Sequence, residues 1–367
     1  MRVIKSIVLA LVIASLVLTA CATATTAPAT TEAPTSAPAT TEPPTSAPAT
    51  TEAPTSAPAT TEAPTVAATP IALPPINPAD YSGDIVMAGS STVYPVSERM
   101  VEQFNAEGFE GLGTIKLDSV GSGAGFERFC VSGETDISNA SRAIKDSEVA
   151  SCEEINRTPI AFRIGTDAIA IVVNKSNTFV KDVTLEELGK IFSSDATKWS
   201  DVRPDWPAED IHRYAPGTDS GTFDFFVEFV SSVVYGTDNG ETMFLNAANL
   251  QASEDDNVLV QGVAGDQYAI GFFGFAYFAE NEDKLNVLSV NGVAPSYETA
   301  ENNTYPLSRP LFIYSDAGIM NDKPQVAAFI SYYLTNVSDM ISSVGYFPAS
   351  TEAMNQAKQA WLDATAR

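Results

Sequence analysis

The sequence predicts an α/β protein in which short strands alternate with helices, carried behind an export signal and a proline-rich tether. Three observations lead to this prediction. Residues 1–20 combine cations with an apolar run, and residues 22–80 repeat TTEAPTSAPA with almost no large apolar side chain. From about Tyr81, aromatic and branched aliphatic residues recur with strand-like and helix-like spacing. The region 81–367 is long enough for two lobes with cores of their own.

The N-terminal segment is typical of a lipoprotein signal. Arg2 and Lys5 precede an uninterrupted apolar and small run from Ile7 to Ala20, which ends in Leu-Thr-Ala-Cys. A transmembrane helix is the alternative, but these fourteen residues, at about 1.5 Å each, cannot cross a hydrocarbon core of roughly 30 Å. We expect cleavage of residues 1–20 and lipidation of Cys21, whose thiol is the acyl acceptor, and therefore an extracytoplasmic protein anchored to the cell membrane.

The next segment, 21–80, is predicted to be a disordered tether. It repeats with a period of ten and contains no Lys or Arg. A segment of this composition has no core to bury and cannot offset the entropy lost on ordering. Its Pro and Thr content favours an extended, semi-rigid spacer that holds a domain away from a membrane. A cell-wall-spanning or mucin-like stalk would serve the same mechanical purpose.

Charge and cysteine content exclude several kinds of partner. The formal net charge of -26 makes nucleic acid and anionic lipid poor partners for the general surface. With Cys21 lipidated, Cys130 and Cys152 remain as one pair in an exported protein, which favours a disulfide over two buried thiols. Two cysteines and the single His212 do not suffice for a structural zinc site, so we expect no metal and no cofactor.

The helices and strands predicted for the globular region are given in chain order. A strand followed by a helix is predicted within 84–104, with a break at Gly89, and again within 114–130, where GSGAG forms the turn. A third short strand is expected within 135–144, and a strand that is apolar on both faces within 161–177. The later predicted elements are a capped helix within 183–202, a helix over 221–234, strands at 268–278 and 305–315, and helices at 324–335 and from about Ser350.

Three polar loops precede predicted helix starts: GSST at 89–92, GSGAG at 121–125 and DSGT at 219–222. Each alone is a common turn. Ligands of open α/β sheets collect at the carboxyl ends of strands, and helix starts present unpaired backbone N–H groups. We therefore expect the three loops to converge on one anion.

Six stretches carry a resemblance that covers nearly the whole globular region. In order they are GSSTVYPV, GSGAGFERF, GETDISNASRAI, GTDSGTF, AIGFFGFAYF and YPLSRPLFIY. They are similar to the successive motifs of the phosphate-binding protein of ABC-type phosphate importers. The resemblance implies a type II periplasmic-binding-protein fold, in which two α/β lobes joined by two crossover strands close on one anion. It implies a first lobe of 82–164 with 306–367 and a second lobe of 165–305.

The resemblance also implies site residues. The phosphate ligands that it implies are Ser91, Thr92, Ser122, Ser220, Gly221 and Thr222. Hydroxyls donate to oxyanions or accept from a protonated oxygen, and backbone N–H groups add bonds without a full charge. The chain departs from the family pattern twice, because Ser141-Arg142 replaces an aspartate and Pro216 replaces an arginine. The spacing therefore predicts that the first lobe supplies the cation, Arg142, and that the second lobe supplies a carboxylate, Asp219.

Asp219 is predicted to test whether the guest carries a proton. Phosphate keeps at least one proton at neutral pH and sulfate keeps none, so an ionised acceptor bonds phosphate and leaves sulfate facing an unpaired negative charge. A desolvated group without a partner costs about 1–3 kcal/mol, and more when it is charged. Capping the helix over 221–234 is a second, compatible role for Asp219, and a surface salt bridge is the alternative for Arg142.

The predicted function is capture of inorganic phosphate by a lipid-anchored receptor, expected to be a monomer, that delivers it to the permease of an ABC transporter. The alternatives are a receptor for another tetrahedral oxyanion and a surface sensor or adhesin that keeps the fold. An enzyme, such as a phosphatase with Ser91 or Ser220 as nucleophile, is disfavoured. The sequence offers one histidine, no spare cysteine and no Asp/His cluster to activate such a nucleophile.

Overall fold

The computed structural model describes residues 68–366, which lie within one compact unit, Thr65–Arg367. The predicted signal, Cys21 and most of the predicted tether lie outside the described residues. Within 68–366, none of the helices has the combination of length and apolar character that crossing a bilayer requires.

The first part of the described chain alternates strands with helices, as predicted. Its elements are η1 (Pro78–Asp80), β1 (Ile85–Gly89), α1 (Tyr94–Phe104), the π-helical turn η2 (Asn105–Phe109), β2 (Ile115–Ser119), α2 (Ser122–Cys130), β3 (Ile137–Ala140) and α3 (Asp146–Glu154). Strand β1 lies between β2 and β3, and both pairings are parallel. The carboxyl ends of the three strands therefore meet at one edge of the sheet, and a polar loop follows each of them.

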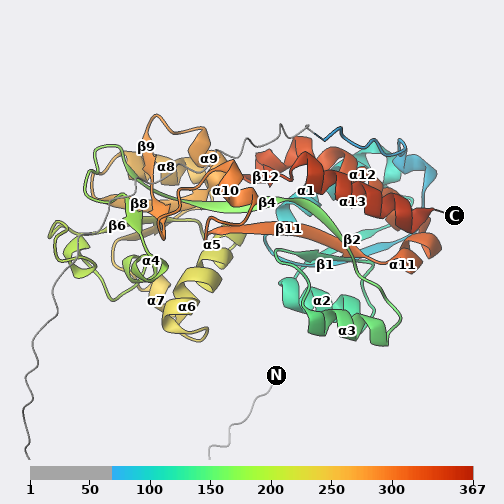
Figure 1. The fold of residues 1–367 in the computed structure, drawn as a ribbon, viewed down its shortest axis with the longest axis horizontal. Helices are drawn as coiled ribbons and strands as arrows, with labels where there is room; N and C mark the ends of the chain where they lie inside the picture. The colour runs from blue at the N-terminus through green and yellow to red at the C-terminus, as the bar shows by residue number, and fades with distance from the viewer. Residues whose placement is uncertain (1–67, 367) are drawn as a thin grey trace, which may run out of the picture. The chain divides into compact units, whose positions relative to one another are not determined.

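Two strands run between the halves of the sheet, β4 (Ile160–Asn174) and β11 (Ser308–Ser315) (Figure 1). They pair antiparallel with each other, and β11 also pairs with β3. The second half of β4 pairs with β8 (Ala269–Gly274), so one strand contributes to both halves. The order across the sheet is β2-β1-β3-β11-β4-β8-β6-β7. As predicted, β4 is buried along most of its length.

The chain between β4 and β11 builds the second half of the sheet and the helices around it. Its further elements are β5 (Asp182–Val183), α4 (Leu185–Ile191), η3 (Trp199–Asp201), β6 (His212–Ala215), α5 (Gly221–Phe226), η4 (Val227–Ser231), α6 (Ser232–Tyr235), α7 (Gly240–Leu245), β7 (Leu250–Ala252), α8 (Asp256–Ala264), α9 (Phe275–Ala279), β9 (Leu285–Val287), β10 (Ser289–Val290) and α10 (Tyr297–Glu301). The predicted capping box is confirmed at α4, because the Thr184 hydroxyl accepts the Glu187 N–H at 3.1 Å and the Glu187 carboxylate accepts the Thr184 N–H at 2.8 Å. The predicted helix over 221–234 is also confirmed, with the π-helical turn η4 between α5 and α6.

The C-terminal part returns to the first half of the sheet. It consists of α11 (Ala317–Asp322), α12 (Pro324–Met340), η5 (Ile341–Val344), β12 (Phe347–Pro348) and α13 (Thr351–Thr365). Helices α12 and α13 cover one face of this half, while α2 and α3 lie on the other face (Figure 1). Segments from both ends of the described chain therefore form the first half.

Two large apolar cores fill the halves. The first contains Phe104 and Phe329, whose rings meet edge to face with centroids 5.2 Å apart. The second contains Phe226 and Phe272, whose rings stack with centroids 4.1 Å apart. We call the elements around these cores the first and the second lobe.

The globular body begins before residue 81, where the sequence predicted its start. Leu73 and Ile76 pack against the first core. Asn355 of α13 holds the same segment, since its side chain accepts the Ile71 N–H at 2.7 Å and donates to the Thr69 carbonyl at 2.9 Å. The reason is local, because branched apolar side chains reappear once the repeat has ended.

Two boundaries inside the body also differ from the prediction. Helix α2 begins at Ser122, so most of GSGAG belongs to the first turn of the helix. The predicted strand over 268–278 ends at Gly274 and continues as α9. A run that is apolar throughout has no periodicity to separate a buried strand from a buried helix.

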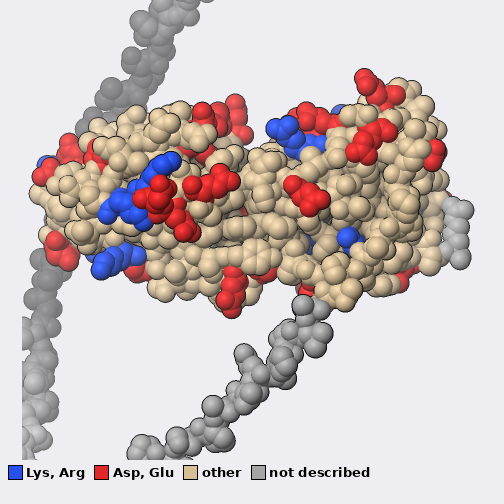
Figure 2. Space-filling model, turned by 90° about the horizontal axis from the view of Figure 1, so that it is seen from above, with Lys and Arg blue, Asp and Glu red and all other residues tan. Residues whose placement is uncertain are grey.

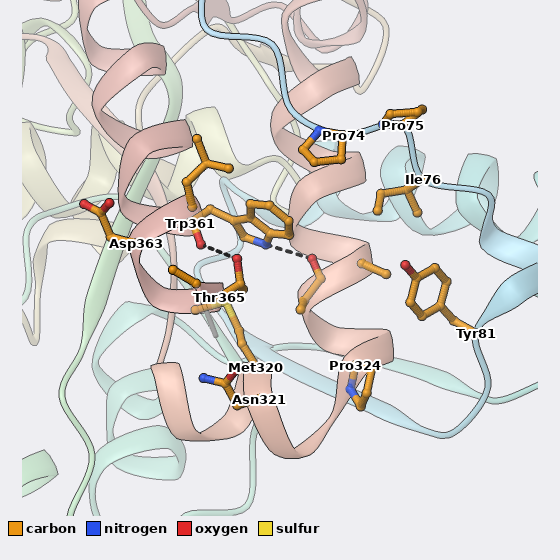
Figure 3. Close-up of a pocket in the computed structure, with 14 residues that line it drawn as sticks. Pro74, Pro75, Ile76, Tyr81, Met320, Asn321, Pro324, Trp361, Asp363 and Thr365 are labelled. Atoms are coloured by element: carbon orange, nitrogen blue, oxygen red, sulfur yellow. Dashed lines mark hydrogen bonds between the residues drawn. The ribbon is translucent and has the colours of Figure 1, made fainter.

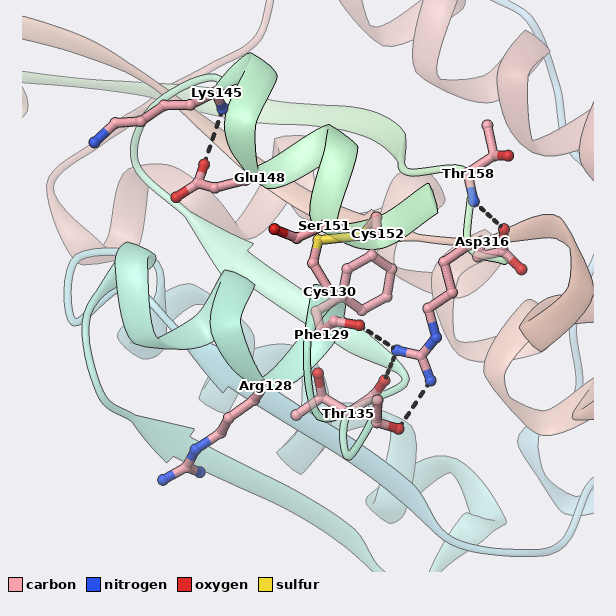
Figure 4. The surroundings of a disulfide bond; sticks show 12 residues. Arg128, Phe129, Cys130, Thr135, Lys145, Glu148, Ser151, Cys152, Thr158 and Asp316 are labelled. Atoms are coloured by element: carbon pink, nitrogen blue, oxygen red, sulfur yellow. Dashed lines mark hydrogen bonds between the residues drawn. A yellow bond between two sulfur atoms is a disulfide. The ribbon is translucent and has the colours of Figure 1, made fainter. Parts of the chain in front are cut away.

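The predicted disulfide joins Cys130 of α2 to Cys152 of α3 (Figure 4). Beside it, Arg157 donates to the backbone carbonyls of Phe129 and Thr135 at 2.7 and 2.8 Å, which gives polar partners to the chain around the end of α2. The disulfide and this arginine fix the C-terminal ends of α2 and α3. The opposite ends of both helices border the cavity described below.

Candidate functional site

A cavity of about 590 Å³ opens where the first lobe meets the second. From the first lobe it is lined by Ser90–Thr92, Gly121–Gly123, Ser141–Ala143 and Lys145; from the second lobe and β11 it is lined by Asp224, Phe225, Glu228, Phe229 and Ser308–Pro310. Four residues predicted as anion ligands, Ser91, Thr92, Ser122 and Arg142, are among them. Two of the three predicted loops therefore meet in one cavity.

The first loop connects β1 to α1 and is held close to α2. A Cβ on Gly125 of α2 would lie 2.6 Å from the Cα of Gly89, so the helix and the strand end approach more closely than a side chain allows. Thr92 is fully buried. Ser91 is partly exposed, and its hydroxyl donates to Asp224 Oδ2 at 2.7 Å. The loop thus presents one hydroxyl at the cavity mouth and one at its floor.

The second loop is tied to the residues that follow β3. The Ser122 hydroxyl accepts the Ser141 N–H at 3.1 Å and lies 3.3 Å from the Ser141 hydroxyl. Ser122 is also the first residue of α2, where backbone N–H groups lack partners within the helix. These contacts gather hydroxyl and N–H donors on one wall of the cavity.

Arg142 lines the same wall, but its guanidinium is paired with a carboxylate. It donates to both oxygens of Glu148 at 2.7 and 2.8 Å. The hydrogen bonds with Glu148 raise the pKa of Arg142, and the nearby charge of Glu228 adds to this shift. Burial opposes ionisation of Glu148, yet the bonds from Arg142 and from the Lys145 N–H outweigh it and lower the pKa of Glu148. Arg142 therefore lines the cavity, as predicted, and also forms the salt bridge that was the alternative interpretation of this residue.

The third predicted loop does not line the cavity. Gly221 packs against Thr92, and a Cβ on Gly221 would lie 2.7 Å from the Thr92 Cα. This contact turns the preceding residues away, so that Asp219 is exposed and its N–H faces Glu254 Oε1 at 3.4 Å. The residue that caps α5 is Ser220, whose hydroxyl accepts the Thr222 N–H at 3.2 Å. Asp219 was predicted to face the anion and, as a compatible second role, to cap the helix; here it lies outside the cavity lining, and Ser220 is the cap.

The carboxylates that line the cavity are not Asp219 but two residues that the sequence analysis missed, Asp224 and Glu228. Asp224 and Glu228 stand four residues apart on the rod formed by α5 and η4, so they share one face. Their signal in the sequence was their place in FDFFVEF, where the residues between them are mostly buried aromatic or aliphatic side chains. Asp224 is the carboxylate that contacts Ser91 across the two lobes.

Arg309 at the start of β11 also lines the cavity and was missed by the sequence analysis. Its guanidinium donates from Nε to Asp167 Oδ2 at 3.0 Å, and from a terminal nitrogen to Gly221 O at 3.0 Å and to the Thr92 hydroxyl. The ring of Phe225 lies 3.8 Å from its central carbon. A single arginine inside the apolar motif LSRPLF was the available signal.

Comparisons with known proteins identify the family. A model of the PBP superfamily domain matches residues 38–337. Protein SphX of Synechocystis is 41% identical over 290 residues, which are 77% of this chain and 83% of the relative. The phosphate-binding protein PstS of Staphylococcus saprophyticus is 35% identical over 269 residues, which are 72% of this chain and 80% of the relative. The chain belongs to the PstS family of the PBP superfamily.

Solved structures agree with this membership. A protein from Planctomyces limnophilus, described as a possible phosphate binding protein, is 34% identical with a TM-score of 0.70 and covers 78% of this chain and 99% of its own. An ABC-type phosphate transport receptor from Vibrio cholerae is 23% identical with a TM-score of 0.52, covering 72% of this chain and 99% of its own, and supports the fold alone. The predicted α/β periplasmic-binding-protein fold is confirmed for the described residues.

A second cavity of this PstS-family protein, about 700 Å³ in volume, lies between residues 74–81 and the helices α11 to α13 (Figure 3). Its wall is largely hydrocarbon. The Trp361 indole N–H donates to the Ala327 carbonyl at 2.9 Å, and the Thr365 hydroxyl donates to the Trp361 carbonyl at 2.8 Å. No Lys or Arg is among the described residues that line it. An anion therefore finds no positively charged side chain there, and it would meet the carboxylate of Asp363.

The residues that could bind a metal are sparse. Among residues 68–366, no group of three or more His, Cys, Asp and Glu side chains is arranged to hold an ion. His212, the single histidine of the chain, contacts Asp266 and does not line the cavity. The cavity lining supplies hydroxyls, the guanidinium groups of Arg142 and Arg309, the ammonium group of Lys145, and carboxylates.

Proposed function

We propose that this PstS-family protein binds inorganic phosphate outside the cytoplasm and delivers it to the permease of an ABC transporter. The observation that carries the proposal is the cavity in which Thr92, Ser122 and Arg309 meet. Hydroxyl donors and a guanidinium at the carboxyl ends of strands suit a tetrahedral oxyanion. The phosphate-binding protein PstS of Staphylococcus saprophyticus supports the choice of phosphate among such anions.

We assign the ligands in two groups. Ser91, Thr92, Ser122 and Arg142 line the cavity, which supports their role as first-lobe ligands. The second group, Ser220, Gly221 and Thr222, stands next to Thr92 at the start of α5, and a hinge motion of the lobes would bring its donors to the anion. The lobes that move are those predicted from the sequence, 82–164 with 306–367 and 165–305, with the first lobe extended by the segment from residue 69.

A carboxylate in this site distinguishes phosphate from sulfate, because only phosphate has a proton to donate to it. Asp219 was predicted for this role. Both carboxylates are exposed, but Asp224 has the better geometric support, since it lines the cavity and accepts the Ser91 hydroxyl at 2.7 Å, whereas Asp219 does not line the cavity. We therefore propose Asp224 as the proton acceptor and keep Asp219→Asn as the comparison variant.

The setting of the protein follows from the same proposal. Removal of residues 1–20 and lipidation of Cys21 would anchor a monomer to the outer face of the cell membrane through the tether. The chain has 46 acidic and 20 basic residues, and on the face in Figure 2 acidic side chains lie over both ends, with basic ones grouped beside them mainly on the left end. Neither nucleic acid nor an anionic lipid surface is a partner that this charge favours.

Equilibrium dialysis with radiolabelled phosphate tests the proposal. The purified protein should retain phosphate at submicromolar concentration, and a large excess of sulfate should not displace it. Equal competition by sulfate would instead favour a general receptor for tetrahedral oxyanions. No retention of either anion, with the fold intact by circular dichroism, would favour a sensor or adhesin that keeps only the fold.

A phosphatase is the alternative from a different class. It would need an activated nucleophile, and the hydroxyl of Ser91 donates to Asp224 with no histidine in the cavity lining. We expect no release of p-nitrophenol from its phosphate ester above the uncatalysed rate. Release that disappears in Ser91→Ala would replace the receptor by an enzyme.

A further inference from the structure

Arg309 and Asp167 form an ion pair between the two strands that run from one lobe to the other. They are direct partners in the antiparallel register of β4 and β11, and Arg309 Nε donates to Asp167 Oδ2 at 3.0 Å. We propose that Arg309 supplies the positive charge that holds the anion and that Asp167 is the positioning residue that fixes its guanidinium. The proposal rests on the proposed function, and it assigns a cation that the sequence analysis sought in Arg142.

The cations in the cavity lining are not equally suited to bind an anion. The lining carries three cations, which differ in their bonding partners and in how deeply they are buried. Arg142 is already bound to both oxygens of Glu148, and Lys145 is exposed. Arg309 is 8% exposed. Because screening by water is weakest around a buried charge, the same attraction for an anion is worth most at Arg309.

The surroundings of the guanidinium fix its plane. One face stacks on Phe225 at 3.8 Å, and one terminal nitrogen donates to the Gly221 carbonyl at 3.0 Å and to the Thr92 hydroxyl. The other terminal nitrogen lies 3.5 Å from the Ser141 hydroxyl. The terminal nitrogens therefore lie among the groups proposed to bind phosphate, which suits the planar fork of arginine and not the point charge of lysine.

Asp167 has a geometry that suits a positioning residue. It is fully buried, it does not line the cavity, and its Oδ1 has no hydrogen-bond partner among the described residues. Its one bonded oxygen holds the inner edge of the guanidinium. One terminal nitrogen already donates to Gly221 and Thr92, which leaves the other, 3.5 Å from the Ser141 hydroxyl, for the anion. Because both residues sit on paired strands, the orientation of the cation is set by the sheet and not by a loop.

The test of Arg309 uses the whole protein and inorganic phosphate as the probe. Arg309→Met should weaken phosphate binding at least about 100-fold, and Arg309→Lys, which keeps the charge and loses the fork, about tenfold. The matched control is Arg163→Met, because Arg163 lies on the neighbouring strand β4, also forms an ion pair, with Glu301 at 2.8 Å, and is absent from the cavity lining. The control should bind phosphate within about threefold of the wild type.

The test of Asp167 separates positioning from simple charge. Asp167→Asn removes a negative charge near the anion, so attraction alone predicts tighter binding, whereas loss of positioning predicts binding about tenfold weaker. The arginine Nε–H signals of isotope-labelled protein give an independent readout. Adding phosphate should shift the Arg309 signal, identified by its absence in Arg309→Lys, and should leave the Arg163 signal in place.

The outcomes are distinguishable. Wild-type protein that binds no phosphate would overturn the proposed function together with this inference. Wild-type binding with unchanged affinity in both Arg309 variants, or with losses equal to that of Arg163→Met, would overturn the role of Arg309 alone. Unchanged or tighter binding in Asp167→Asn would overturn the positioning role.

Discussion

Gly221 is the point where the second lobe touches the first polar loop, and replacing it tests whether this contact belongs to the binding mechanism. A Cβ on Gly221 would lie 2.7 Å from the Cα and 3.0 Å from the N of Thr92, whereas ordinary contacts of a Cβ lie at 3.4–4 Å. Gly221→Ala therefore requires the two backbones to separate by roughly 0.7 Å. Backbone atoms cannot swing aside as the end of a side chain can.

The magnitude follows from this overlap. Overpacking of one carbon costs about 1–3 kcal/mol. If this cost falls on the arrangement that holds phosphate, the affinity should drop by about 5- to 150-fold. Calorimetric titration with phosphate measures the affinity, and thermal unfolding measures the accompanying loss of stability.

The matched control is Gly240→Ala. Its Cβ would lie 2.7 Å from the N of Ser232, an overlap of the same size, but between α6 and α7 within the second lobe. Both variants should lower the melting temperature, and only Gly221→Ala should weaken phosphate binding. Phosphate affinity within twofold of the wild type in Gly221→Ala, or an equal loss in Gly240→Ala, would refute the reasoning.

Three further predictions address selectivity, stability and pH. Asp224→Asn should lower the preference for phosphate over sulfate at least about tenfold, and Asp219→Asn should leave it within twofold in the same competition assay; the reverse ranking would return the role to Asp219. Replacing Cys130 and Cys152 together by Ala should lower the free energy of unfolding in urea by about 2–4 kcal/mol with little change in phosphate affinity; a loss below about 1 kcal/mol would contradict the cross-link as the brace of α2 and α3. Burial raises the pKa of Asp256 from 3.8 to about 6, so its ionisation opposes folding at neutral pH, and the contribution of this one group to stability should rise as the pH falls from about 6 towards 4. Asp256→Asn should be more stable than the wild type at pH 7 and should lack this gain, as a pH series of melting curves would show; equal stability of the two proteins at pH 7 would contradict the assignment.

The fold could be predicted where a change of periodicity coincides with a glycine. Gly89 separates β1 from the segment that leads into α1, and the alternation of strands and helices led to the correct class. The prediction failed where composition is uniform. The apolar run after Tyr268 hides the change from β8 to α9, and the start of the body at residues 69–76 depends on contacts with α13 that no local pattern reveals.

The candidate site could be predicted only where the loop that carries the sequence signal also lines the cavity. Ser91, Thr92 and Ser122 stand at helix starts and line the cavity. Asp219 stands in an equally suggestive loop, yet the contact between Gly221 and Thr92 turns it outward. Arg309 was missed because its meaning depends on pairing between β4 and β11, which places residues 142 positions apart in the chain side by side.

The central claim is that the cavity between the lobes binds phosphate through a built anion site. Isothermal titration of the purified protein with phosphate and with sulfate, side by side at neutral pH, tests it most directly. We predict one phosphate per chain at submicromolar affinity and no measurable heat from sulfate. Phosphate heat absent at every concentration, or the same affinity for both anions, would contradict the account.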